Sequence, residues 1–148
     1  MVWKPAATVA AVIERGGRFL IVEERIDGLH VLNQPAGHLD PGESLLQACR
    51  REVLEETAHR FTPEALVGIY RWHYAERDVT FLRFCFRGRI DGVENRGLDR
   101  EIVRLHWLTR DELLARRAEH RSPLVQRCVD DFVSGRQFPL EVLSREYA

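Results

Sequence analysis

The segment GHLDPGESLLQACRREVLEETAH, residues 37–59, joins a loop rich in glycine and proline to a run of strong helix formers. The run opens at Glu43 and reaches about Thr57, and Pro63 blocks helical continuation beyond the next turn. We therefore expect a loop followed by a helix, and the residues on that helix decide how the rest of the chain is interpreted.

Three carboxylates share one face of the expected helix. Glu52, Glu55 and Glu56 are spaced i, i+3 and i+4, so they fall within an arc of roughly 100°. The apolar stripe beside Glu52 and Glu56 consists of Leu45, Cys49 and Val53. Like charges on a partly buried surface resist desolvation unless a cation compensates them or a proton is taken up. Ligands that are all oxygen suit Mg²⁺, with Mn²⁺ as an alternative, and Mg²⁺ often binds substrate phosphate.

Arg51 lies one helical turn before Glu55, where a guanidinium would orient that carboxylate. The alternative interpretation is that this helix, rich in arginine and glutamate, is an exposed surface held by salt bridges, as isolated charge clusters often are. The cluster alone does not decide between the two, so the spacing around it matters.

That spacing resembles the signature of the Nudix hydrolases. Gly37 is followed after five residues by Glu43 and, after seven more, by the run from Arg51 to Glu56. The sequence departs from the Nudix pattern at Ala58, where the family has glycine, a residue that eases a left-handed helix end. The resemblance favours the metal site over the exposed surface.

The resemblance also implies roles for these side chains. Glu52, Glu55 and Glu56 would bind the metal, Arg51 would orient them, and the Gly37 carbonyl would be an added ligand. A glutamate would deprotonate the water that attacks phosphorus, giving a phosphate monoester plus phosphate or diphosphate.

The general base is not readable from the pattern, because Nudix enzymes differ in it. We expect Glu52, with Glu55 and Glu101 as alternatives. Glu101 matches a position that supplies a further metal-binding carboxylate in several Nudix enzymes, but it could equally be an exposed strand residue.

The remaining elements predict an α+β fold. We expect strands at 8–13, 19–22, 66–74, 80–90 and 101–108, helices at 43–57, 111–117 and 123–133, and a long loop at 27–42. Together these predict a single Nudix hydrolase domain over residues 1–148, in which a mixed β-sheet is sandwiched between α-helices.

The composition limits the partners. Lys plus Arg number 22 against 23 Asp plus Glu, so the net charge of −1 gives no broad attraction to a nucleic acid polymer or an anionic membrane. No apolar run approaches the roughly 18 residues of a membrane span, and we expect a cytoplasmic protein. Cys49, Cys85 and Cys128 are expected to be buried and free. The sequence does not settle the oligomeric state, and a monomer is compatible with it.

Three stretches that reach beyond the 37–59 segment resemble phosphatases of the Nudix family: NQPAGHL at 33–39, FLRF at 81–84 and RSPLV at 121–125. This likeness implies a Mg²⁺-dependent phosphatase acting on nucleoside tri- and diphosphates and on the hydroxymethylpyrimidine diphosphate of thiamine synthesis. Trp72, Phe81 and Arg83 are candidates for holding the substrate ring, although each could instead be core or ordinary surface.

Two other functions stay open at this point. A diphosphatase for nucleotide sugars such as ADP-ribose would use the same helix with a different pocket. A catalytically silent Nudix-like binding module would retain the fold without turnover, but it would not need the intact glutamates and Arg51.

Overall fold

The computed structural model describes residues 1–144 of the protein. Its strands are β1 (Ala6–Arg15), β2 (Arg18–Ile26), β3 (Leu29–Asn33), β4 (Ala36–His38), β5 (His59–Tyr74), β6 (Val79–Val93), β7 (Ile102–Thr109) and β8 (Phe138–Pro139). Its helices are α1 (Leu45–Thr57), α2 (Arg110–Ala115) and α3 (Leu124–Val133), with 3-10 turns η1 (Arg117–Glu119) and η2 (Leu140–Val142). No described helix is long and apolar enough to cross a membrane.

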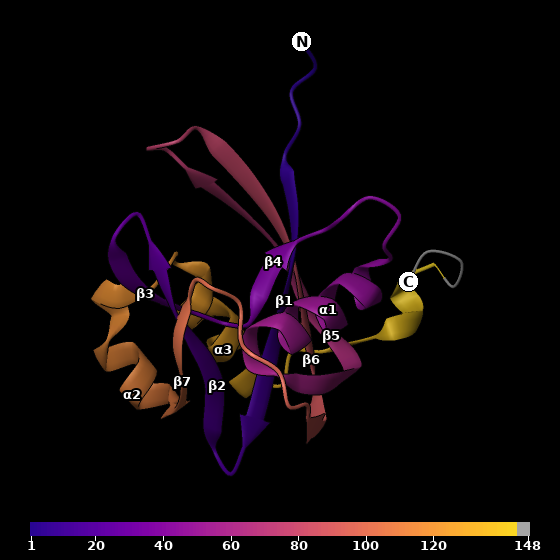
Figure 1. The fold of residues 1–148 in the computed structure, drawn as a ribbon. Helices are drawn as coiled ribbons and strands as arrows, with labels where there is room; N and C mark the ends of the chain where they lie inside the picture. The colour runs from indigo at the N-terminus through magenta and orange to yellow at the C-terminus, as the bar shows by residue number, and fades with distance from the viewer. Residues whose placement is uncertain (145–148) are drawn as a thin grey trace.

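The sheet is mixed, because its central pair is parallel and its other pairs are antiparallel. The strand order is β3-β2-β1-β6-β5-β8, with β4 paired to β1 and β7 paired to β2. The parallel pair β1 and β6 runs in register from Ala6 opposite Phe81 to Ile13 opposite Gly88. The hairpin of β5 and β6 extends beyond the rest of the sheet, beside the N-terminal segment (Figure 1).

Helices cover both faces of this sheet, as the alternation of side chains along β1 demonstrates. Val9 and Ala11 pack in one core cluster with residues of α1, whereas Ala10 and Val12 pack in the other with residues of α3. Successive residues of a strand point to opposite faces, so α1 and α3 lie on opposite sides (Figure 1). The predicted α+β fold, a mixed sheet between helices, is confirmed.

The prediction of a long loop over residues 27–42 was wrong. Asp27 and Gly28 have φ values of 50° and 79° and form a tight turn, from which β3 returns antiparallel to β2. β4 pairs antiparallel with β1, from Thr8 opposite His38 to Ala10 opposite Ala36. Both strands are short and owe their conformation to partners elsewhere in the chain, so the local sequence carried no alternating pattern.

The structure also begins one strand and one helix at other residues than predicted. The strand expected from residue 66 begins at His59, because Pro63 sits where the pairing of β5 with β6 is irregular and so does not break the strand. The helix expected from Glu43 begins at Leu45, with Ser44 as its N-cap. Glu43 precedes the helix and accepts a hydrogen bond from the Asp40 amide at 3.0 Å.

Both ends of α1 are well defined. The Ser44 hydroxyl accepts from the Gln47 amide at 3.1 Å, and the Gln47 side chain accepts from the Ser44 amide at 2.9 Å, which forms a capping box. At the other end Ala58 adopts φ 59° and ψ 15°, and its amide donates to the Leu54 carbonyl at 2.9 Å. The position therefore keeps the left-handed conformation that suits glycine, although the residue is alanine.

The Ala58→Gly variant is expected to be more stable than the natural protein by about 1 kcal/mol, because a left-handed conformation costs a residue with a Cβ roughly 1–2 kcal/mol. Part of that gain is offset by the loss of a buried methyl group. Urea denaturation at constant pH measures the change. Ala48→Gly, in the interior of α1, should instead destabilise the protein, and a destabilised Ala58→Gly variant would contradict this account of the helix end.

Candidate metal centre and substrate cavity

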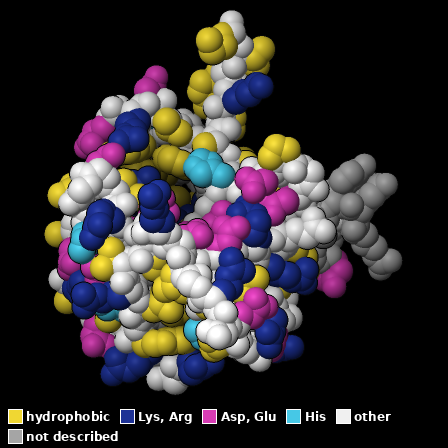
Figure 2. Space-filling model, viewed as in Figure 1, with side chains coloured by type: hydrophobic (Ala, Val, Ile, Leu, Met, Phe, Trp, Pro, Cys, Tyr) yellow, Lys and Arg dark blue, Asp and Glu magenta, His cyan; other side chains and the backbone are white. Residues whose placement is uncertain are grey.

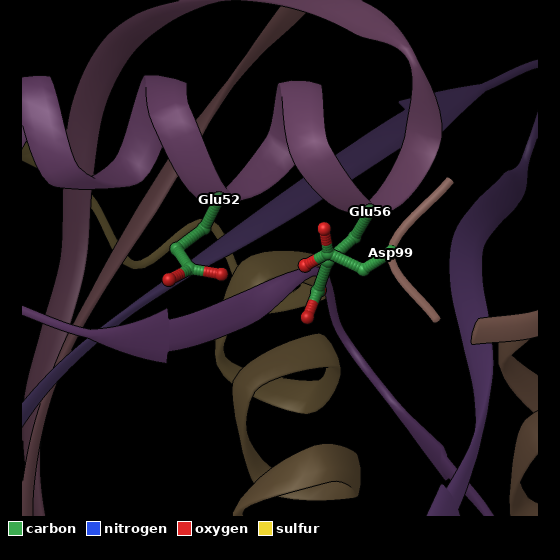
Figure 3. Close-up of side chains that lie close together, drawn as sticks. All are labelled: Glu52, Glu56 and Asp99. Atoms are coloured by element: carbon green, nitrogen blue, oxygen red, sulfur yellow. The ribbon is translucent and has the colours of Figure 1, made fainter. Parts of the chain in front are cut away.

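Three carboxylates converge at the C-terminal end of α1. Glu52 and Glu56 project from the same side of the helix, and Asp99 reaches toward them from the segment before β7 (Figure 3). An oxygen of each side chain lies within 4.8 Å of the others. Glu56 is buried, with 7% of its surface exposed, while Glu52 and Asp99 are half-buried.

Backbone hydrogen bonds hold two of these groups in place. The Ala36 amide donates to Glu56 Oε1 at 2.9 Å, which joins the carboxylate to the start of β4. The Asp99 amide donates to the Glu55 carbonyl at 2.9 Å, which ties the loop before β7 to the end of α1. The site is thus assembled from α1, β4 and a loop that lies more than forty residues later in the sequence.

Gly37 allows β4 to pass directly against the Glu52 carboxylate. A Cβ atom built at this glycine would lie 2.1 Å from Glu52 Cδ, closer than any two such atoms can approach. A side chain at position 37 would therefore displace the carboxylate. The closeness also keeps the Gly37 backbone near the group of acidic oxygens, as a carbonyl ligand requires.

The electrostatics of the cluster call for a cation. Burial raises the pKa of Glu56 to about 10, and nearby Glu24, Glu52 and Asp99 add to the rise against the hydrogen bond from Ala36. Burial also raises the pKa of Glu52 to about 7. Buried carboxylates resist ionisation unless a cation lies beside them, and these side chains offer only oxygen atoms as ligands. Both properties fit a hard divalent metal ion.

Arg51 binds the outer side of the cluster. Its guanidinium donates to Glu43 Oε2 at 2.6 Å, to Glu52 Oε1 at 2.8 Å and to Glu55 Oε2 at 3.2 Å. It also donates to the His38 carbonyl at 2.9 Å. One arginine thus connects two of the predicted ligands, Glu52 and Glu55, to the loop before α1, the arrangement expected of an orienting residue. Glu55 lies on this outer side and does not belong to the close group of three.

The structure places the predicted site residue Glu101 in an exposed turn two residues after Asp99. Among the described residues, the close carboxylate group contains Asp99 and not Glu101, whose role stays a prediction. Neither Asp99 nor the buried Glu24 was predicted from the sequence. Asp99 lies in a segment without periodicity, and the only signal for Glu24 is a charged pair that ends the apolar run of β2.

A cavity of about 170 Å³ opens beside the carboxylates. Ala36, Gly37 and Glu24, which contact or neighbour the cluster, also line it. The face drawn in Figure 2 shows a hollow bordered by hydrophobic, basic and histidine side chains, with acidic side chains next to it. A group bound in the cavity would therefore lie next to the metal centre.

All three candidates for substrate binding, Trp72, Phe81 and Arg83, line this cavity. The rings of Trp72 and Phe81 stack with centroids 5.7 Å apart and planes 15° apart. Arg83 is buried, and its guanidinium donates to Asn33 Oδ1 and to Gln34 Oε1, each at 2.9 Å. The cavity thus combines an aromatic wall with a fixed polar floor, as sites for heterocycles do.

Comparisons with known proteins agree with this geometry. A family described as NUDIX domain matches residues 3–128. Phosphatase NudJ from Escherichia coli strain K12 is 37% identical over 142 residues, which cover 95% of this chain and 92% of that protein. A NUDIX hydrolase from Nitrosomonas europaea has a TM-score of 0.93 and 52% identity, over 95% of this chain and 97% of that one. A MutT NUDIX hydrolase from Burkholderia pseudomallei shares the fold, with a TM-score of 0.75, 18% identity, and coverage of 87% and 98%.

The burial of Glu52 and Glu56 makes stability depend on pH when metal is removed. Their raised pKa values mean that the folded protein keeps protons that the unfolded chain has lost, so the free energy of unfolding should fall as pH rises from about 5 to about 8. In Glu56→Gln this fall should be smaller, because the amide resembles the protonated carboxyl.

Urea denaturation in EDTA at the two pH values tests this expectation. The exposed Glu64 on β5 provides the control, and Glu64→Gln should show the same fall as the natural protein. An equal fall in Glu56→Gln would show that this carboxyl is not the source of the pH dependence.

Proposed function

The chain belongs to the Nudix hydrolase family, and from this premise we propose that it uses Mg²⁺ to cleave phosphoanhydride bonds of nucleoside tri- and diphosphates, releasing phosphate. Membership of this family makes the protein a Nudix-type phosphohydrolase. The identity of the metal and of the substrates is what we propose. One observation carries it: a group of buried carboxylates next to a cavity that suits a heterocycle.

In this proposal Glu52, Glu56 and Asp99 hold the ion, and Glu55 and the Gly37 carbonyl are further ligands. A bound Mg²⁺ would neutralise charge on the phosphate oxygens and make the attacking water more acidic. Mn²⁺ offers the same preference for oxygen ligands and is the natural substitute.

Glu52 is proposed to accept the proton of the attacking water. Arg51 supports this role, because its contact with Glu52 at 2.8 Å orients the carboxylate. Glu55 and Glu101 remain the alternative bases. Glu55 also contacts Arg51, whereas Glu101 is exposed and would have to approach the bound substrate.

The size of the cavity supports a small heterocycle. Its volume of about 170 Å³ is close to the roughly 150 Å³ cavity that accommodates one benzene ring, so a six-membered ring fits within it. Trp72 and Phe81 would stack on the ring, and the Asn33 and Arg83 side chains would contact its polar edge. The size and lining of the cavity thus support pyrimidine nucleotides and hydroxymethylpyrimidine diphosphate as substrates.

Glu56→Gln is expected to lower kcat for Mg²⁺-dependent phosphate release from cytidine triphosphate by about 100-fold or more, a typical effect of removing a group that stabilises charge in the transition state. Circular dichroism should show that the variant is folded. The exposed Glu64→Gln is the matched control and should retain activity. An active Glu56→Gln enzyme would overturn the metal assignment, and faster cleavage of ADP-ribose to AMP would favour a nucleotide-sugar diphosphatase.

Trp72→Ala should raise KM for cytidine triphosphate by about 10-fold with a smaller change in kcat, because stacking on an aromatic ring contributes about 1–3 kcal/mol per base. Steady-state kinetics with a phosphate-release assay measures both constants. Trp3, 69% exposed at the N-terminus, is the matched control, so Trp3→Ala should leave KM unchanged. An unchanged KM in Trp72→Ala would exclude the cavity as the ring site.

A further inference from the structure

A second, larger hollow adjoins the cavity. It has a volume of about 850 Å³ and lies between the tip of β5, the turn η1 and the start of α3. Trp72, Arg121, Ser122 and Leu124 line both the cavity and this hollow, which we call the arginine groove. The arginine groove is therefore continuous with the cavity that lies beside the carboxylates.

Arginines dominate the charge of the arginine groove. Arg71, Arg117 and Arg121 line it, and none of the three forms an ion pair with any described residue. The acidic groups of the lining are engaged, since Asp130 pairs with Arg110 at 2.8 Å and Glu76 accepts from the Tyr74 hydroxyl at 2.9 Å. The groove thus offers guanidinium groups that are free to bind an anion, and guanidinium pairs well with phosphate.

The groove also has an aromatic surface. Trp72 and Tyr74 both line it, and their rings stack with centroids 5.2 Å apart and planes 15° apart. Trp72 also contributes to the cavity, where its ring stacks on that of Phe81. A ligand that fills the cavity can therefore continue along the aromatic side chains into the groove.

We propose that the arginine groove is a second subsite, which binds a further phosphate carried by the ribose of a nucleotide substrate. Arg71, Arg117 and Arg121 bind this phosphate through their guanidinium groups. The placement rests on the proposed function, which puts the ring in the cavity and the anhydride at the carboxylates. The phosphate is either a 3′-phosphate of the same nucleotide or the linkage to a following nucleotide.

The test compares three probes without an anhydride bond: cytidine 5′-monophosphate, cytidine 3′,5′-bisphosphate and the 5′-phosphorylated cytidine dinucleotide. Titration calorimetry in EDTA measures their affinities for the natural protein and for Arg71→Gln/Arg117→Gln. Both arginines are exposed and outside the catalytic site, so the double variant should fold normally. Arg50→Gln/Arg96→Gln, at two exposed positions outside the groove lining, removes the same charge and is the control.

The natural protein and the control variant should bind the bisphosphate or the dinucleotide about 10-fold more tightly than the monophosphate, and the groove variant should lose that preference. Whichever of the two probes shows the preference identifies the source of the phosphate. Equal affinity for all three probes, or a preference that survives in the groove variant, overturns the proposal. Because the assay contains neither metal nor turnover, a failed groove is distinguishable from a failed hydrolase assignment, which the Glu56→Gln activity measurement addresses.

Discussion

The burial of Glu52 and Glu56 beside Asp99 brings negative charges together where water can do little to solvate them. In the metal-free protein this cost appears as the raised pKa values of both glutamates. Much of the surrounding structure serves to keep the group together. The Ala36 amide holds Glu56, Arg51 holds Glu52, and Gly37 leaves room for the carboxylate that a side chain would displace. A divalent cation explains why so much negative charge is kept in one place.

The topology then brings the substrate cavity to the same point. β4 supplies Gly37 on one side and pairs with β1, whose parallel partner β6 supplies Phe81 and Arg83. β5 supplies Trp72 opposite Phe81 in the adjacent antiparallel pair. Residues from distant parts of the sequence therefore meet because β1 pairs with both β4 and β6. The arginine groove is continuous with this cavity and extends to the start of α3, so the ring site beside the carboxylates joins the free arginines.

The sequence was most informative where function requires a fixed local spacing. Of the three helix glutamates predicted to converge, Glu52 and Glu56 lie in the close group, whereas Glu55 contacts Arg51 on its outer side. Trp72, Phe81 and Arg83 were proposed as ring contacts, and the structure brings them into one cavity. Ala58 was recognised as a departure from the Nudix pattern. Its left-handed conformation shows that the backbone ends the helix in this way even without glycine.

What the sequence could not reveal depends on contacts between distant residues. Asp99 enters the carboxylate group only because its amide is bonded to the Glu55 carbonyl, and nothing near it in the sequence signals that contact. The strands β3 and β4 likewise depend on their pairing with β2 and β1.

The most direct test of the account is anomalous scattering from crystals soaked in Mn²⁺. The account predicts a peak bonded to the carboxylates of Glu52, Glu56 and Asp99; a peak elsewhere, or none at a saturating concentration of metal, would contradict it.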